Sequence, residues 1–294
     1  MATPLPICYL NGAYLPLAEA RVSPLDRAFL FADAVYEVMP VYGRRPFRFA
    51  AHCERLARSL KALGMADPYT REQWHELIAT LIERNAPHNT AADLYVYWQV
   101  TRGMQFGRNH APLPDIERTV FAFCAPLILP DQAALERGVS CVTAQDNRWG
   151  RCDIKSTALL ANILLRERAT EAGASEAILL REGLLTEGSA SAVHVVVNGE
   201  LLTPALSPQV LPGLTRGAVE KMAARAQIPC RDAALTQAQL RAASEVMLSA
   251  ATREVIAVTA IDGIPVGTGQ PGPVWRAVHT QLQKYKGELA GRPW

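Results

Sequence analysis

The sequence predicts an α+β protein with two domains. Strand and helix patterns follow one another irregularly in both halves of the chain, which favours α+β over a regular doubly wound sheet. The length of 294 residues exceeds what a single hydrophobic core usually organises. Residues 125–131 carry two prolines and no charge until the last position, which is typical of a linker. We therefore expect a smaller N-terminal α/β domain at 1–124 and a larger C-terminal domain at 132–294.

In the first half, short runs rich in β-branched and aromatic residues predict strands. The pair Asn11-Gly12 follows the first run and favours a tight hairpin turn. Apolar residues at helical spacing predict two helices, the first of which stops at Gly64. The expected strands are 8–10, 35–42, 94–101 and 119–124, and the expected helices are 51–63 and 72–84.

The second half repeats these signals. The pair Asn198-Gly199 lies between two apolar runs and predicts another hairpin. One helix should stop at Gly173, and a second should begin near Thr215, whose hydroxyl is a candidate N-cap. The expected strands are 177–180, 193–197, 200–203, 246–249 and 255–261, and the first of the two helices is expected at 158–172.

The composition narrows the class of protein. A net charge of +2 gives no electrostatic argument for nucleic acid or a membrane as a partner. The N-terminal residues do not resemble a secretory signal, and no segment has the length and apolarity of a membrane span. The six cysteines form no C-x-x-C pair and the six histidines have no metal-ligand spacing, so we expect no metal and a reducing, cytoplasmic location.

The usual signatures of P-loop, zinc-protease and α/β-hydrolase sites are absent. Three polar segments stand out instead: 148–156 (RWGRCDIKS), 185–189 (LTEGS) and 211–216 (LPGLTR). In the first, Lys155 follows Ile154 and precedes a mostly apolar helix start. A lysine in this setting should be partly buried, which favours the uncharged amine that a Schiff base requires.

Taken in order, these segments resemble the fold-type IV enzymes that use pyridoxal phosphate (PLP), and most closely the D-amino-acid transaminases. The resemblance spans nearly the whole chain and includes 26–31, 35–38, 53–56 and 100–103. It implies a two-domain fold-type IV architecture and a homodimer with shared active sites. It also implies that amino acids and 2-oxo acids are the substrates and that Lys155 binds PLP. In this family a glutamate of the T-E-G segment, here Glu187, keeps the pyridine nitrogen protonated.

The resemblance also assigns the remaining cofactor contacts. A helix that opens after Gly213 offers backbone N–H groups to a phosphate, and a guanidinium adds a fork of donors. A second turn, 249–252, has alanine at position 251, where the D-specific enzymes commonly have threonine, so only backbone donors are expected there. The residues implied are Arg55, Leu211, Leu214, Thr215, Ala250 and Ala251, with Leu211 packing against the cofactor ring.

The substrate residues implied are Tyr36 of the V-Y-E-V segment and the R-x-H pair Arg108 and His110. Together a phenol, a guanidinium and an imidazole would hold the substrate α-carboxylate. The loop with the R-x-H pair is one residue longer than in the enzymes it resembles. If the longer loop displaces Arg108 from the site, Arg148 is an alternative cation for binding the substrate α-carboxylate. Alanines also replace residues frequent in the family, namely glycine at positions 28, 32 and 34 and asparagine at 192.

These residues make a D-amino-acid:2-oxo-acid transaminase the leading hypothesis, with D-alanine or D-glutamate as donor and 2-oxoglutarate or pyruvate as acceptor. Three activities of the same fold remain open. Branched-chain L-amino-acid transaminases usually have phenylalanine in place of Tyr36, and aminodeoxychorismate lyases lack the combination of V-Y-E-V with R-x-H. An R-selective amine transaminase would need a pocket that has relaxed its requirement for a carboxylate. A protein that binds PLP without catalysis is a fourth alternative.

Overall fold

The computed structural model describes residues 3–289. The chain forms two compact units. Unit 1 contains residues 3–128 and a short return segment, Ile154–Ala158, whereas unit 2 contains Leu129–Asp153 and residues 159–289. The chain leaves unit 1 inside the expected linker, although the first two linker residues still belong to strand β6 (Thr119–Pro126). Lys155 lies in unit 1, whereas the sequence placed it in the larger C-terminal domain.

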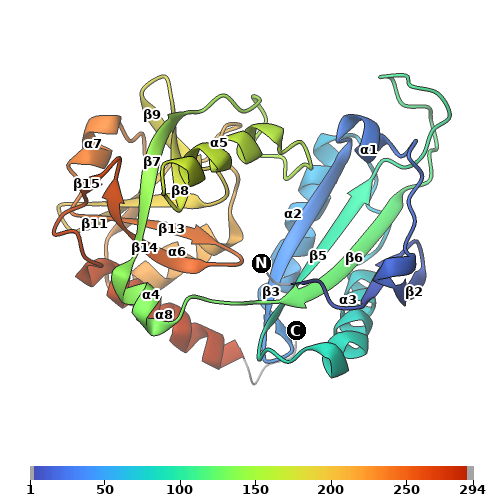
Figure 1. Cartoon of the computed structure of the whole chain (residues 1–294), viewed down its shortest axis with the longest axis horizontal. Coiled ribbons are helices and arrows are strands. Elements are labelled where there is room, and N and C mark those ends of the chain that lie inside the picture. Colours follow the sequence, from blue (N-terminus) through green and yellow to red (C-terminus); the bar gives the residue numbers. More distant parts are fainter. Residues whose placement is uncertain (1–2, 290–294) are drawn as a thin grey trace. The chain divides into compact units, whose positions relative to one another are not determined.

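Unit 1 is built on a six-stranded antiparallel sheet with the order β2-β1-β6-β5-β3-β4. Figure 1 shows β3, β5 and β6 side by side at the centre of this sheet. The strands are β1 (Ile7–Leu10), β2 (Ala13–Pro16), β3 (Ala34–Tyr42), β4 (Arg45–Pro46), β5 (Leu94–Thr101) and β6. The helices are α1 (Arg27–Phe31), α2 (Phe49–Ala62) and α3 (Arg71–Asn85), with 3-10 turns η1 (Leu17–Glu19) and η2 (Ala86–His88).

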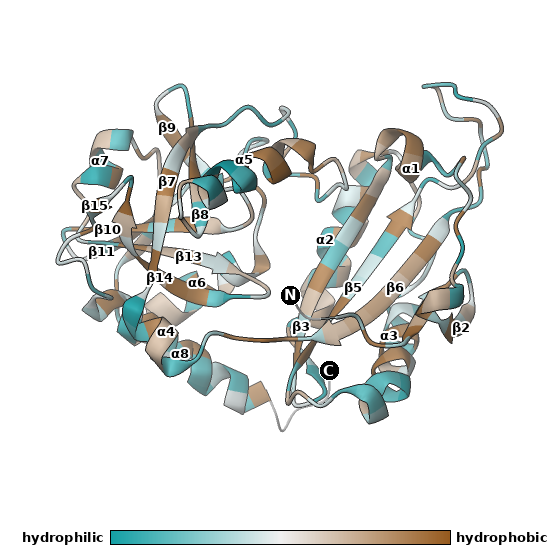
Figure 2. Ribbon diagram, viewed as in Figure 1, coloured by the Kyte–Doolittle hydropathy of each residue, from teal (hydrophilic) through white to brown (hydrophobic). Residues whose placement is uncertain are grey.

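Local sequence explains most of these boundaries. The hairpin predicted at Asn11-Gly12 is confirmed, and both residues have the positive φ that such a turn requires. Helix α2 begins two residues before its predicted start, and α3 begins after a capping box formed by Thr70 and Gln73. Both helices pack against the sheet to form one apolar core, and Figure 2 shows the apolar colouring of the central strands.

Unit 2 is built on a nine-stranded mixed sheet with the order β12-β11-β10-β13-β14-β7-β8-β9, and β15 pairs with β14. The second predicted hairpin, at Asn198-Gly199, is confirmed between β10 and β11. The strands are β7 (Val139–Gln145), β8 (Glu176–Arg181), β9 (Leu184–Gly188), β10 (Ala192–Val197), β11 (Glu200–Pro204), β12 (Cys230–Ala233), β13 (Glu245–Ala250), β14 (Glu254–Ile261) and β15 (Ile264–Pro265).

The helices of unit 2 are α4 (Gln132–Arg137), α5 (Leu160–Glu171), α6 (Leu214–Arg225), α7 (Gln237–Arg241) and α8 (Pro273–Leu289). Helix α5 packs on β7 and β8, whereas α6 packs on α8 and β13. The prediction that Thr215 caps α6 was wrong, because Gly213 occupies the N-cap and Thr215 lies in the first turn. No side-chain hydrogen bond caps this helix start.

The described part of the chain lacks two kinds of feature. None of its helices combines the length and the apolarity needed to cross a membrane. Among residues 3–289, no three or more histidine, cysteine, aspartate or glutamate side chains gather as metal ligands would.

Candidate active site

The return segment fixes Lys155 against strand β3 in unit 1. The Tyr36 amide donates to the Lys155 carbonyl oxygen at 3.0 Å, and the Lys155 amide donates to the Ser59 hydroxyl at 3.3 Å. Ser156 forms a β-bridge with Val35, which extends this contact by one residue. Lys155 is half-buried, as its sequence context predicted, and its Nζ lies 4.2 Å from the centre of the Tyr36 ring. The amine and the phenol predicted for the site therefore lie on the same face of the sheet.

The Tyr36 ring is held by its neighbours on the sheet. It stacks on Tyr97 of β5 with ring centres 5.5 Å apart, and Tyr97 stacks in turn on Phe123 of β6 at 5.1 Å. The Tyr97 hydroxyl donates to Gln99 at 2.7 Å, which fixes the middle ring. This row of rings restricts how Tyr36 can move beneath the Lys155 amine.

Glu37 points to the opposite face of β3, because successive strand residues alternate. Its carboxylate is fully enclosed and accepts hydrogen bonds from Arg55 Nε at 2.8 Å and Nη2 at 2.6 Å, and from His52 Nδ1 at 2.7 Å. Burial alone would raise the pKa of Glu37, but Arg55 and His52 outweigh burial and hold that pKa at about 2. Burial lowers the pKa of His52, although the Glu37 carboxylate opposes that shift. The pair with Glu37 thus fixes the orientation of Arg55.

Arg108 and His110 meet on the ring of Phe31, at the end of α1. The Arg108 guanidinium lies 5.1 Å from the ring centre, and the His110 ring approaches it edge-on at 5.4 Å. Both side chains are exposed within the chain. Among residues 3–289, neither has a hydrogen bond or ion pair to Tyr36 or Lys155 of the same chain. The structure therefore brings the R-x-H pair together but does not bring it to Tyr36 within one chain.

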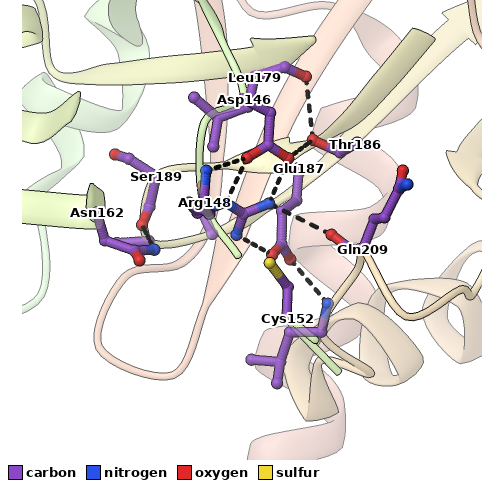
Figure 3. A network of polar contacts seen from close by, with 12 residues as sticks. Asp146, Arg148, Cys152, Asn162, Leu179, Thr186, Glu187, Ser189 and Gln209 are labelled. Atoms are coloured by element: carbon purple, nitrogen blue, oxygen red, sulfur yellow. Dashed lines mark hydrogen bonds and ion pairs between the residues drawn. The ribbon is translucent and has the colours of Figure 1, made fainter. Parts of the chain in front are cut away.

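In unit 2, Glu187 lies near the end of β9 with its carboxylate buried (Figure 3). One oxygen accepts from Arg148 Nη1, and the other accepts from the Leu211 amide at 3.1 Å. Burial raises the pKa of the Glu187 carboxyl, whereas the Arg148 cation and the Leu211 amide oppose that rise. Of the residues predicted for the cofactor, Glu187 and Leu211 are thus in direct contact.

Arg148 is itself anchored by Asp146, which the sequence did not single out. Its Nε donates to Asp146 Oδ1 and its Nη2 to Asp146 Oδ2, both at 2.9 Å. The Thr186 hydroxyl donates to the same carboxylate at 2.8 Å. Burial opposes the charge on Arg148, but the two carboxylates raise its pKa above the ordinary value. Because both carboxylates engage this guanidinium, the alternative role as a substrate cation does not suit Arg148.

The start of α6 and the end of β13 lie next to each other in unit 2. Gly213 begins α6, and a Cβ built on it would lie 4.0 Å from the Ala192 Cβ. Ala192 pairs with Ser249 across β10 and β13, one residue before the turn that contains Ala250 and Ala251. The hydroxyl of Ser249 is bonded to the buried ring of His194 at 2.9 Å, which steadies the start of that turn. Leu214 and Thr215, in the first turn of α6, therefore lie in a segment next to Ala250 and Ala251, which end β13 and begin the turn after it.

The donor set of the chain fits PLP. Unit 2 offers a buried carboxylate of fixed orientation for a pyridine nitrogen. It also offers an uncapped helix start beside a second turn for a phosphate. Unit 1 offers a half-buried lysine amine on an aromatic face. These are the three kinds of group that PLP requires for covalent attachment, for electronic control and for anchoring.

Fold and donor set together define a PLP-dependent enzyme. Residues 34–261 match the family of amino-transferases of class IV. The chain belongs to this family, which confirms the fold class and the cofactor expected from the sequence.

Relatives cover almost the whole chain. A D-alanine aminotransferase of Staphylococcus aureus (strain MW2) is 37% identical over 278 residues, which are 94% of this chain and 96% of the relative. Another, of Bacillus licheniformis, is 36% identical over 273 residues, which are 93% and 94% of the two chains. A solved branched-chain amino acid aminotransferase of the archaeon Thermoproteus uzoniensis, with norvaline, superposes with a TM-score of 0.83 at 26% identity, covering 96% of this chain and 95% of that chain.

Proposed function

We propose that this enzyme transfers the amino group of D-amino acids, such as D-alanine and D-glutamate, to 2-oxo acids such as 2-oxoglutarate and pyruvate. The observation that carries the proposal is the placement of Lys155 Nζ over the ring of Tyr36. The Lys155 amine, which would accept the substrate α-proton, then lies beside the Tyr36 phenol, which would bind the substrate carboxylate. The relatives described as D-alanine aminotransferases, at 36–37% identity, support the D-specific reading.

Each residue then has a defined task. PLP, when bound, supplies an electron-withdrawing ring that stabilises the charge left on the α-carbon after the proton departs. Lys155 would attach the cofactor, and its Nζ, once the substrate has taken its place, would take the α-proton and pass it to the cofactor carbon. Glu187 would keep the pyridine nitrogen protonated, and Leu211, whose amide binds the Glu187 carboxylate, would pack against the ring. The α6 start and the end of β13 with Ala250 and Ala251 would offer backbone donors to the phosphate. Arg55, whose Nε and Nη2 are bonded to Glu37, is the guanidinium that the resemblance assigns to the same phosphate.

We further propose that the enzyme is a homodimer in which the R-x-H pair of one subunit serves the site of its partner. Arg108 and His110 are exposed and do not bond Tyr36 of their own chain. The first half of α5 is coloured as hydrophobic in Figure 2. It carries exposed apolar side chains at helical spacing, namely Leu160, Ile163 and Leu164. An apolar stripe of this kind is typical of an interface, and twofold dimers are the commonest oligomers.

A branched-chain L-amino-acid transaminase is the second candidate, because the solved Thermoproteus uzoniensis enzyme of that description shares the fold closely. Tyr36 and the R-x-H pair favour the D-specific reading over it. An R-selective amine transaminase and an aminodeoxychorismate lyase of the same fold rank lower. We also propose a cytoplasmic location, since all six cysteines are free, as thiols are in a reducing compartment.

The test is a substrate panel with the purified, PLP-loaded enzyme. D-alanine, L-leucine and R-1-phenylethylamine are each paired with 2-oxoglutarate, and the rate of oxo-acid or ketone formation is measured. We expect the highest kcat/KM with D-alanine. A higher kcat/KM for L-leucine would replace the proposal with the second candidate. Light scattering on the same sample should show a dimer, and a fully active monomer would refute the shared site.

A further inference from the structure

Arg27, in the first turn of α1, has all three guanidinium nitrogens engaged. Its Nε donates to Asp33 Oδ2 at 2.8 Å. Its Nη1 donates to the carbonyl oxygen of Asn109 at 2.7 Å, and its Nη2 donates to that of His110 at 2.8 Å. The residue is buried although the loop residues that it binds are exposed. A rigid fork of donors therefore spans two consecutive carbonyls of the R-x-H segment.

Phe31 joins this fork to the side chains of the same segment. The Arg27 guanidinium lies 4.9 Å from the Phe31 ring centre, on which Arg108 and His110 also rest. Within the segment the Ala111 amide donates to the Asn109 side-chain oxygen at 3.2 Å, and before it the Gln105 amide donates to the Leu25 carbonyl at 3.5 Å. Arg27 thus fixes the backbone of the segment to α1, and Phe31 supports its two functional side chains.

We propose that Arg27 is a positioning residue that sets the affinity for carboxylate substrates by holding Arg108 and His110 in their working orientation. This inference rests on the proposed function, because it assumes that the R-x-H pair binds the α-carboxylate. Arg27 itself is bound to the loop and to Asp33, so it acts through the backbone and does not touch the substrate. Its loss should weaken substrate binding more than it slows the chemical step.

Arg102 offers a matched control. Its Nε donates to the same Asp33 oxygen at 2.7 Å, and its Nη2 donates to the Leu63 carbonyl at 2.7 Å. It makes no hydrogen bond to residues 108–110 among those that the structure describes. Arg102→Lys should therefore disturb the Asp33 ion pair as much as Arg27→Lys does while leaving the R-x-H segment in place.

The experiment measures kcat and KM for D-alanine in Arg27→Lys, Arg102→Lys, Arg108→Ala and the double variant Arg27→Lys/Arg108→Ala. Arg27→Lys should raise KM about tenfold or more with kcat little changed, since an ammonium cannot bridge two carbonyls as the fork does. Arg102→Lys should leave KM unchanged. The double variant should resemble Arg108→Ala alone, because Arg27 acts through Arg108 and the two effects do not add.

Two different failures can be told apart. If Arg108→Ala raises KM but Arg27→Lys matches Arg102→Lys, or if the two effects add fully, the role of Arg27 is wrong and the proposed function stands. If Arg108→Ala leaves KM unchanged, the carboxylate clamp and the role of Arg27 fail together.

Hydrogen exchange and a second variant, Phe31→Leu, distinguish a specific effect of Arg27→Lys from general misfolding. Hydrogen exchange should show faster exchange at residues 109–113 in Arg27→Lys than in Arg102→Lys, with β5 equally protected in both. Phe31→Leu keeps the bonds of Arg27 but removes the ring, so it should raise KM as well, to a smaller extent. Equal exchange of the loop in the two lysine variants, or an unaltered KM in Phe31→Leu, would overturn the proposal.

Discussion

Glu187 is held on both sides, because Arg148 binds one carboxylate oxygen and the Leu211 amide binds the other. A carboxylate fixed in this way cannot rotate to suit a ligand, so the direction in which it meets a pyridine nitrogen is set before the cofactor arrives. Asp146 completes the arrangement, since it neutralises part of the charge on Arg148 and keeps that guanidinium in place.

Glu187→Gln should keep PLP bound but lower kcat for D-alanine by about 100-fold or more, as the loss of an essential electrostatic partner does. The neutral amide keeps the shape of the side chain yet no longer holds a proton on the ring nitrogen. Steady-state kinetics, with cofactor content measured by visible absorbance, provide the check. A rate equal to that of the parent enzyme would mean that Glu187 is only a turn residue.

Asp146→Asn should destabilise the protein by about 3–5 kcal/mol, because it weakens a buried pair and leaves Arg148 short of one counter-charge. Urea unfolding of the two forms measures the difference. The control is Asp153→Asn, since Asp153 also pairs with an arginine two residues away, but at a more exposed position. That change should cost less than about 1 kcal/mol. An equal decrease in the free energy of unfolding of the two variants would show that the buried ion pair contributes no more to stability than the exposed one.

Glu37 makes stability depend on pH. Its pKa is about 2 in the folded chain against an ordinary 4.5, so its contribution is complete above about pH 4.5 and is lost as the pH falls towards 2. Glu37→Gln should therefore lower the free energy of unfolding by about 3 kcal/mol at pH 7 and by much less near pH 2. Urea unfolding at several pH values tests this, with the exposed Glu54→Gln as control. A loss that does not vary with pH would rule out the ion pair as its cause.

The sequence predicted those site residues that lie in recognisable local segments. Lys155 and Glu187 stand in segments whose order is specific, and the alternation of β3 puts Tyr36 and Glu37 on opposite faces. What the pattern could not show is which distant residues meet them. Asp146 lies only two positions before Arg148, but nothing in the sequence shows that this pair meets Glu187, 39 positions away. Likewise, the bonds between Arg27 and residues 109–110 join positions more than 80 apart.

The boundaries were less predictable than the elements. A threonine near a helix start is a good N-cap in general, but at α6 the cap is Gly213. A side chain at the cap would compete for the first amides of the helix, which a phosphate site needs. Ala32 has a φ of 54° at the end of α1, in the left-handed region where glycine is favoured. The frequency of glycine there in the family thus has a backbone cause that composition alone does not reveal.

Arg108→Ala should raise KM for D-amino acids steeply, since leaving a carboxylate unpaired in a partly dry pocket costs about 2–5 kcal/mol. An R-amine has no carboxylate, so any activity towards it should change little. Arg108→Lys should restore binding only in part, because an ammonium lacks the guanidinium fork. His110→Ala should act in the same direction with a smaller effect. D-alanine kinetics that do not respond to Arg108→Ala would mean that the longer loop has moved this arginine out of the site.

Lys155 is proposed to be the residue that carries the cofactor. The chain has five lysines, at positions 61, 155, 221, 284 and 286, so the attachment site can be read directly. The PLP-loaded enzyme is reduced with borohydride, digested and analysed by peptide mass spectrometry. We predict a phosphopyridoxyl group on Lys155 and no visible absorbance of bound cofactor in Lys155→Ala, which should also lose transamination. The same group on another lysine, or substantial turnover by Lys155→Ala, would show that Lys155 does not carry the cofactor.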